Sequence, residues 1–376
     1  MALLVALLVF GSGTFLAPRL VGASTTAGAV YAWFDNDAGQ FCNGTVTVTG
    51  SNHDSKTPVP TRLPAASAVA AGQSHTLAVD ANGAVYGCGF NGSGQLGNAT
   101  GKNSSTPVRA ALPTHIVVTA VAAGWKTSLA LTSTGAVYAW GLNTYGQIGD
   151  GSTSNRSTPV LVHLPAGVVV TAIAAGQYHC LAVTSTGAVY AWGYNGFGQL
   201  GNGGTTRSSV PVRVSLPAGV VAASVGAGDN HSLVVTSTGS IYAFGQNSFG
   251  QLGTGTTTQS NVPVAVSLPT GVVATQVAAG GISLTAQVPE GDYSLAVTTT
   301  GTVYAWGADA QGQLGNNRTT NSSIPVVTQL PSGAIAIAVG AGPNFGHALT
   351  TNGNIYSEIF KFDGLRYEKA GSNNSR

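Results

Sequence analysis

The chain has 376 residues, of which 7% are charged, and its formal net charge is +2. Globular proteins usually carry roughly 25% charged residues, so the surface must consist largely of Ser, Thr, Asn and Gly. Lysine and arginine form no basic stripe. This excludes the usual pattern of a nucleic-acid binder, because the phosphate backbone would meet no cluster of cations. The 43% of hydrophobic residues also argue against a disordered chain.

The N-terminus resembles an export signal. The apolar run from Leu3 to Phe10 is too short to span a bilayer, so no membrane span is predicted. The small residues at Val21-Gly22-Ala23 resemble a cleavage site, which predicts a signal peptide over residues 1–23 and a secreted or cell-envelope protein. A signal peptide usually begins with a basic segment, but no Lys or Arg precedes Arg19. The alternative is therefore a buried apolar strand or a wrongly assigned start of the chain, and in either case a cytoplasmic protein.

One phrase, Gly-x-Val-Tyr-Ala-Trp-Gly in its fullest form, recurs along the chain. Its tyrosines are 52 residues apart in most copies, with a first spacing of 55 and a fifth of 62. A fixed period near fifty residues indicates one supersecondary unit repeated in a closed or stacked array. The tyrosines are Tyr31, Tyr86, Tyr138, Tyr190, Tyr242, Tyr304 and Tyr356.

The copy that begins at Thr171 predicts the anatomy of the unit. Its apolar segments read as four short strands, separated by a tight turn, a glycine hairpin turn and a glycine-rich loop. The strands are expected at 172–176, 179–183, 189–192 and 210–214. Four short strands are typical of a propeller blade. The small Ala-Ala-Gly strand is expected at the crowded axis, and the Tyr and Trp side chains between blades.

The sequence therefore predicts an all-β propeller over residues 26–359. Five blades are complete within the chain; the two ends give six blades if they merge and seven if they stand apart. Residues 360–376 are more highly charged and lose the repeat. They are interpreted as a non-repeat tail or a truncated last blade.

Three phrases carry a resemblance to a known family. Ala-Ala-Gly-x-x-His-x-Leu-Ala-Val, Gly-x-Val-Tyr-Ala-Trp-Gly-x-Asn and Gly-Gln-Leu-Gly recur over about residues 28–359. They are similar to those of the regulator of chromosome condensation repeat family, and the export signal makes the chain resemble a secreted, bacterial-type member. The resemblance implies a seven-bladed propeller and so favours seven blades over six.

Histidines begin the second strand in three copies, at His75, His179 and His231. A metal site is the alternative, but other copies hold Thr127 or Tyr293 in this slot. Hydrogen bonding at blade edges is therefore the preferred interpretation. No metal and no cofactor is predicted.

The three cysteines are Cys42, Cys88 and Cys180. Their odd number is not that of a disulfide framework, and their spacing is not that of zinc ligands. All three are interpreted as repeat variation.

No catalytic pattern is recognisable. The recurring Asn-x-x-Gly-Gln-Leu-Gly loops are followed by no predicted helix, so they do not fit a nucleotide-binding fingerprint. The side chains of their glutamines, such as Gln95, are expected to form hydrogen bonds with backbone groups. The chain has no nucleophile elbow and no paired carboxylates within a repeat, so an enzyme is not predicted.

Differences between copies indicate a binding surface instead. The turns before the second strand should open onto one end of the ring, and the sixth copy carries an insertion at this turn, from Gly281 to Gly291. Aromatic side chains there could anchor a partner. The candidate partner-binding residues are Gln73, Ser74, Trp125, Lys126, Gln177, Tyr178, Asp229, Asn230, Gln287, Glu290, Asp292, Tyr293, Asn344 and Phe345.

The predicted function is a non-catalytic, monomeric protein-binding module that is exported or held at the cell surface, in keeping with the signal-like N-terminus and the low charge. The resemblance implies that some relatives, bacterial propeller inhibitors of β-lactamases, bind through the same turns. It also implies an alternative, guanine-nucleotide exchange on a small GTPase. A carbohydrate-binding propeller is a third hypothesis, but only Trp125 and Tyr178 offer matching aromatics.

Overall fold

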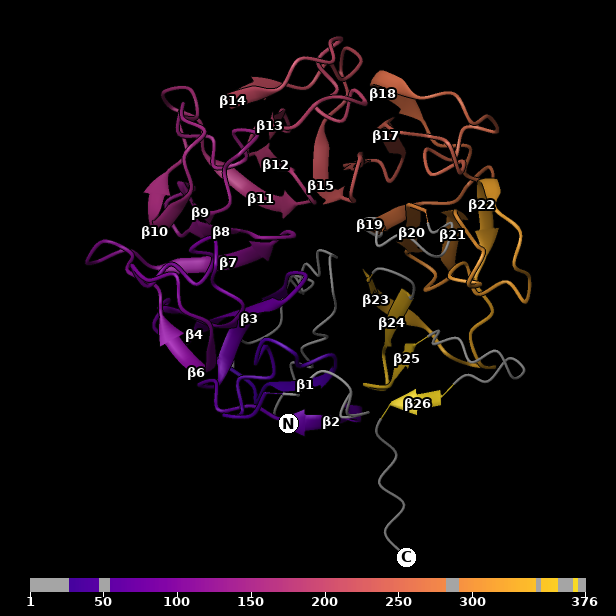
Figure 1. Ribbon diagram of the computed structural model, residues 1–376. Coiled ribbons are helices and arrows are strands. Elements are labelled where there is room, and N and C mark those ends of the chain that lie inside the picture. Colours follow the sequence, from indigo (N-terminus) through magenta and orange to yellow (C-terminus); the bar gives the residue numbers. More distant parts are fainter. Residues whose placement is uncertain (1–26, 47–54, 282–290, 343–345, 358–367, 371–376) are drawn as a thin grey trace, which may run out of the picture.

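The computed structural model describes residues 27–46, 55–281, 291–342, 346–357 and 368–370. This part of the chain contains strands and no helix. The strands form antiparallel sheets arranged as blades around one axis (Figure 1). An all-β propeller is therefore confirmed.

Six of the sheets have four strands each, joined in chain order. The first three blades are β3 (Ala66–Ala71), β4 (His75–Asp80), β5 (Val85–Gly89) and β6 (Ser104–Arg109); β7 (Val118–Ala123), β8 (Thr127–Thr132), β9 (Val137–Gly141) and β10 (Arg156–Leu161); and β11 (Val170–Ala175), β12 (His179–Thr184), β13 (Val189–Gly193) and β14 (Ser208–Arg213). The other three are β15 (Ala222–Ala227), β16 (His231–Thr236), β17 (Ile241–Gly245) and β18 (Ser260–Ala265); β19 (Ala274–Gly280), β20 (Tyr293–Thr298), β21 (Val303–Gly307) and β22 (Ser322–Val327); and β23 (Ala336–Ala341), β24 (Gly346–Thr350), β25 (Ile355–Ser357) and β26 (Glu368–Ala370).

The six four-stranded sheets agree with the predicted count of six blades, and not with the count of seven that the resemblance favoured. The first and last described repeats do not share a sheet. β26 completes the last blade from the predicted tail, whereas β1 (Tyr31–Phe34) and β2 (Ser55–Pro60) form a separate two-stranded sheet. Figure 1 shows this sheet between the first and last blades. The N-terminal repeat thus contributes a two-stranded sheet, not a seventh four-stranded blade.

The first strand of each blade lies at the axis, as predicted, because its small side chains let neighbouring blades approach closely (Figure 1). Gly124 shows how tight this approach is. A Cβ atom at Gly124 would lie 2.2 Å from the carbonyl oxygen of Gly176 in the next blade. Only glycine fits at such a contact.

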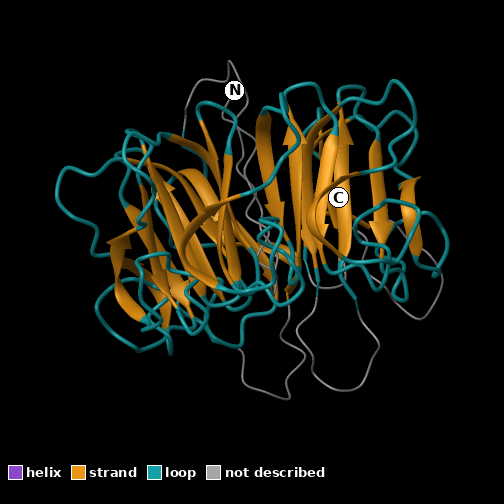
Figure 2. Ribbon diagram, turned by 90° about the horizontal axis from the view of Figure 1, so that it is seen from above, coloured by secondary structure: helices purple, strands orange, loops and turns teal. Residues whose placement is uncertain are grey.

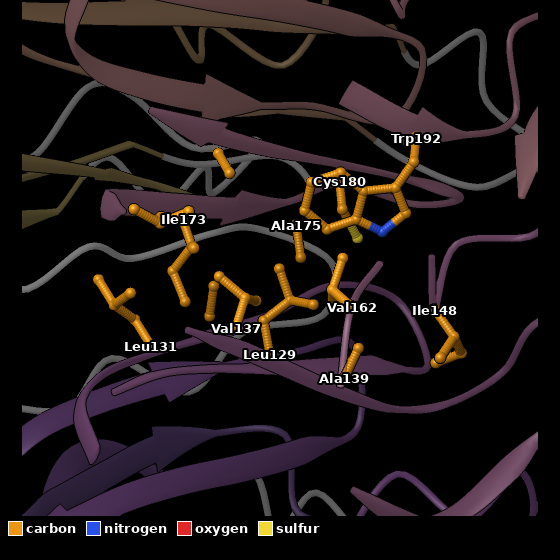
Figure 3. Packing of buried hydrophobic residues seen from close by; sticks show 13 residues of the cluster. Leu129, Leu131, Val137, Ala139, Ile148, Val162, Ile173, Ala175, Cys180 and Trp192 are labelled. Atoms are coloured by element: carbon orange, nitrogen blue, oxygen red, sulfur yellow. The ribbon is translucent and has the colours of Figure 1, made fainter. Parts of the chain in front are cut away.

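The core consists of apolar layers between blades. In the layer between the second and third blades, Leu129, Ile148 and Trp192 are completely buried (Figure 3). The indole Nε1 of Trp192 donates a hydrogen bond to the carbonyl oxygen of Gln147 in the preceding blade, at 2.9 Å. The predicted place of the Trp side chains between blades is confirmed here, and their polar edge also has a partner.

The interface of the two-stranded sheet with the first blade has different chemistry. Cys42, next to β1, forms a disulfide with Cys88 on β5, and both are completely buried. The interpretation of these two cysteines as mere repeat variation was therefore wrong. Cys180 is a free, buried thiol.

Candidate binding face

Two sets of loops meet at one end of the ring. Because adjacent strands are antiparallel, the turn after each first strand and the long loop after each third strand leave the sheet at the same end. The hairpins between second and third strands lie at the opposite end, and Figure 2 shows the loops gathered at both ends. We call the first end the binding face and the second the hairpin end.

Aromatic side chains from two adjacent blades form a chain of contacts on the binding face. Trp125 packs edge-on against Tyr178, with ring centroids 5.1 Å apart, and Tyr178 lies 4.9 Å from Tyr145. Tyr145 in turn lies 4.9 Å from Tyr194, which lies 6.3 Å from Phe197. All five side chains are only partly buried. We call these five residues the aromatic cluster.

A cation extends the cluster toward the first blade. The Nζ atom of Lys126 lies 4.4 Å from the ring centroid of Trp125 and 5.3 Å from that of Phe90. Ammonium groups at these distances are attracted by the negative ring face. The cluster therefore presents aromatic rings that are tilted or edge-on to one another, with a positive charge at one edge.

The sequence prediction found only part of this cluster. Trp125, Lys126 and Tyr178 are brought together as expected, but Tyr145, Tyr194 and Phe197 were missed. The missed residues lie in the long loops, around the recurring Asn of Asn-x-x-Gly-Gln. Variation among copies at these loop positions was a signal that could have found them.

Tyr178 lies at the centre of the cluster, in contact with Trp125, Tyr145 and Tyr194. Burial, followed by the electrostatic influence of Tyr145 and Asp229, raises the pKa of Tyr178 to about 12. The hydroxyl of Tyr178 therefore stays protonated at physiological pH and remains available as a hydrogen-bond donor.

Other predicted face residues are divided between surface and interior. Gln73, Ser74 and Asn230 are partly exposed. Gln177 is 8% exposed and Asp229 only 3%. These two add little surface to a partner contact.

The fifth blade corrects the prediction for Tyr293. This side chain is completely buried, and its hydroxyl donates a hydrogen bond to the carbonyl oxygen of Gly342 in the next blade, at 3.0 Å. It therefore links blades and offers no surface to a partner. The predicted residues Gln287, Glu290, Asn344 and Phe345 lie outside the described residues.

Asp292, His231 and Ser294 form a chain with the spacing of a catalytic triad. Asp292 Oδ2 lies 3.0 Å from His231 Nδ1, and His231 Nε2 lies 2.9 Å from Ser294 Oγ. However, Ser294 is completely buried and donates its only proton to the carbonyl oxygen of Gln251 at 2.9 Å. His231 Nε2 must then be the donor to Ser294, so this serine is not poised as a nucleophile.

The other two histidines repeat this arrangement without the carboxylate. His75 Nε2 lies 3.0 Å from Ser128 Oγ, and His179 Nε2 lies 2.8 Å from Ser232 Oγ, in each case across a blade interface. The prediction that these histidines form hydrogen bonds at blade edges is confirmed. The recurring arrangement shows that the His–Ser pair joins blades.

Asp229 and Asp292 lie close together behind the binding face. Burial, followed by the negative charge of Asp292, raises the pKa of Asp229 well above its usual range. Asp292 Oδ2 lies 3.0 Å from His231 Nδ1 and accepts a hydrogen bond from the backbone N–H of Asn230 at 3.0 Å. Asp229 therefore tends to hold a proton, and the pair adds less negative charge to the face than two carboxylates would.

The part of the chain described by the structure contains no group of three or more His, Cys, Asp or Glu side chains suited to a metal ion. Among the same residues, no helix is long and apolar enough to cross a membrane.

Comparison with known proteins agrees with the propeller fold. A family model for the RCC1-like domain matches residues 19–292, and one for the Regulator of chromosome condensation (RCC1) repeat matches residues 300–349. The ultraviolet-B receptor UVR8 of Arabidopsis thaliana is 30% identical over 316 residues, which are 83% of this chain and 68% of the receptor. The human E3 ubiquitin-protein ligase HERC2 is 29% identical over 88% of this chain, but the match spans only 7% of the ligase.

Solved structures show the same fold. Prp20p from Saccharomyces cerevisiae, a protein studied for its binding to Gsp1p and histones, superimposes with a TM-score of 0.75 at 23% identity. The match covers 91% of this chain and 86% of Prp20p. Because the RCC1-like domain model matches most of the sequence, the chain belongs to the RCC1-like domain family.

Proposed function

We propose that this protein is a non-catalytic binding module that holds another protein against the aromatic cluster. The observation that carries the proposal is the partly exposed chain of rings from Trp125 to Phe197, contributed by two adjacent blades. Rigid aromatic side chains bury much area at a small cost in side-chain entropy, which is why they dominate binding energy at interfaces.

The charge of the face constrains the partner. Lys126 supplies a cation beside the rings, whereas Asp229 and Asp292 are buried. The proposed partner surface is therefore apolar and polar, with an acidic group placed to meet Lys126. Because few charges take part, we expect binding to depend weakly on salt.

We also propose that the protein works outside the cytosol. The disulfide between Cys42 and Cys88 supports this proposal, because disulfides persist in oxidising compartments and are rare in the cytosol. The test is fractionation of expressing cells, followed by sequencing of the mature N-terminus and alkylation of free thiols. A cytosolic chain with reduced Cys42 and Cys88 would contradict export.

The binding proposal is tested by comparative capture. Wild-type protein, a binding-face variant with Trp125→Ala and Tyr178→Ala, and a hairpin-end variant with Ser185→Ala and Ser237→Ala are immobilised and exposed to the same extracellular extract. A partner of the binding face should be retained by the wild type and the hairpin-end variant and lost by the binding-face variant.

The nucleotide-exchange alternative is tested separately. Release of labelled guanine nucleotide from small GTPases is measured with and without the protein. We expect no acceleration. A rate increase abolished by the binding-face variant would replace the simple binding module with an exchange factor.

A further inference from the structure

The long loop after each third strand is organised by one polar side chain at its start. This residue is Asn in four blades, at Asn91, Asn143, Asn195 and Asn247, and Asp309 in the fifth. All five loops have the same length, since the fourth strand begins 13 residues after the polar residue in every case. The fifth blade therefore provides a natural replacement of an amide by a carboxyl group.

In the Asn loops, the amide nitrogen lies among oxygen atoms of its own loop. Asn91 Nδ2 donates to the carbonyl oxygens of Thr100 at 2.9 Å and Lys102 at 3.1 Å, and to Asn98 Oδ1 at 3.1 Å. Asn247 Nδ2 likewise donates to the carbonyl oxygens of Thr256 and Thr258, both at 2.9 Å. The loop thus encloses a position where several acceptors converge.

The Asp309 loop keeps the same backbone arrangement. Asp309 Oδ1 accepts from the N–H of Leu314 at 3.0 Å, and Asn321 Oδ1 accepts from the N–H of Asp309 at 2.9 Å. Asn317 has a positive φ of 61°, as Ala99 has at the same place in the first blade, at 63°. The acceptors that surround the amide nitrogen in the Asn loops correspond here to Asn316 Oδ1 and the carbonyl oxygens of residues 318 and 320.

The second carboxyl oxygen, Asp309 Oδ2, is the anomaly. It is buried and has no hydrogen-bond partner among the described residues, and the Asp309 side chain is 0% exposed. It replaces a donor nitrogen with an acceptor in a place built from acceptors. An anionic oxygen among carbonyl oxygens is unfavourable unless a positive charge or a proton lies between them.

We infer that the loop of residues 308–321 binds a hard metal cation, with Ca²⁺ the best fit, between Asp309 Oδ2 and the oxygens of residues 316, 318 and 320. These donors are all oxygen atoms, a carboxylate with carbonyl groups, which is the ligand set that Ca²⁺ prefers. Water would complete its six to eight ligands. A single carboxylate makes this a weak site, of the class that fills at millimolar extracellular Ca²⁺.

The test uses the full-length protein, freed of metal with EDTA and returned to chelator-free buffer at pH 8. Calcium is titrated by calorimetry, and the melting temperature is followed with calcium, magnesium or sodium. We expect one calcium per chain and a rise in melting temperature of about 3 °C at saturation. Asp309→Asn should bind no calcium at this site, and calcium should leave its melting temperature unchanged.

A second variant makes the test independent of any loss of folding. Asn247→Asp places a carboxylate in an equivalent loop, so it should raise the calcium stoichiometry from one to two. The inference is overturned if the wild type shows neither heat nor a shift with any of the three cations.

Discussion

Cys42 and Cys88 are bonded to each other at the position where other blade interfaces pair a glycine with a large aromatic side chain. At the next interface, a Cβ atom on Gly97 would lie 2.8 Å from Nε1 of Trp140. At the interface between the two-stranded sheet and the first blade, cysteine replaces both the glycine and the aromatic residue. A covalent bond thus replaces the packing of a tryptophan on a glycine where the two-stranded sheet meets the ring.

Removal of this disulfide should loosen the N-terminal sheet. The Cys42→Ser, Cys88→Ser double variant is expected to lose about 2–4 kcal/mol of unfolding free energy, because the bond closes a long loop in the unfolded chain. Denaturant unfolding with and without a reducing agent measures this effect. Reduction should destabilise the wild type and leave the double variant unchanged; an equal response of both would contradict this account.

Cys180 should tolerate serine unusually well for a buried thiol. Its Sγ contacts the carbonyl oxygen of Gln147 at 3.4 Å, whereas Ser128 at the equivalent position donates to Gln95 at 2.7 Å. We expect Cys180→Ser to keep or raise stability by up to about 1 kcal/mol, since a better hydrogen bond forms. Cys180→Ala, measured in the same denaturant series, should be less stable than Cys180→Ser.

Acid should weaken the blade interfaces through the buried histidines. Burial lowers the pKa of His75 and His179 to about 3, from an ordinary value of 6.5. The unfolded chain therefore binds protons between pH 6.5 and 3 while the folded chain does not, so stability falls as pH falls through this window. Each histidine should cost about 2 kcal/mol at pH 5 relative to pH 7.

The matched variant for this effect is His75→Thr, because Thr127 occupies the same slot in the second blade. It should lower stability at pH 7, where the bond to Ser128 is lost, but reduce the dependence on pH. Unfolding by denaturant at pH 7, 6 and 5 tests this, and an unchanged slope would show that His75 does not drive the acid response.

The repeat period allowed much of the fold to be predicted, because each blade reuses one pattern of strand and turn residues. The expected strand at 179–183 is β12, and the small Ala-Ala-Gly segments lie at the axis. The pairing of Cys42 with Cys88 was not predictable from an odd number of cysteines. This pairing depends on which side chains meet across a blade interface. The alignment of the repeats alone does not show those contacts.

The site was less predictable than the fold for a related reason. Trp125 and Tyr178 stood out because they lie in the same turn of successive copies, at adjacent positions of that turn. Tyr145 and Tyr194 come from different loop positions. Tyr194 meets Tyr178 within one blade, whereas Tyr145 reaches Tyr178 from the adjacent blade. Tyr293 misled the prediction because burial between blades is not visible in a turn sequence.

The most direct test of the binding face is the dissociation constant of a captured partner for three purified proteins. These are the wild type, the Trp125→Ala, Tyr178→Ala variant and the Ser185→Ala, Ser237→Ala variant at the hairpin end, each with its melting temperature checked. The account expects a loss of affinity of at least about tenfold for the aromatic variant, as for residues that dominate an interface, and none at the hairpin end. Unchanged affinity in a folded aromatic variant, or a loss confined to the hairpin-end variant, would contradict it.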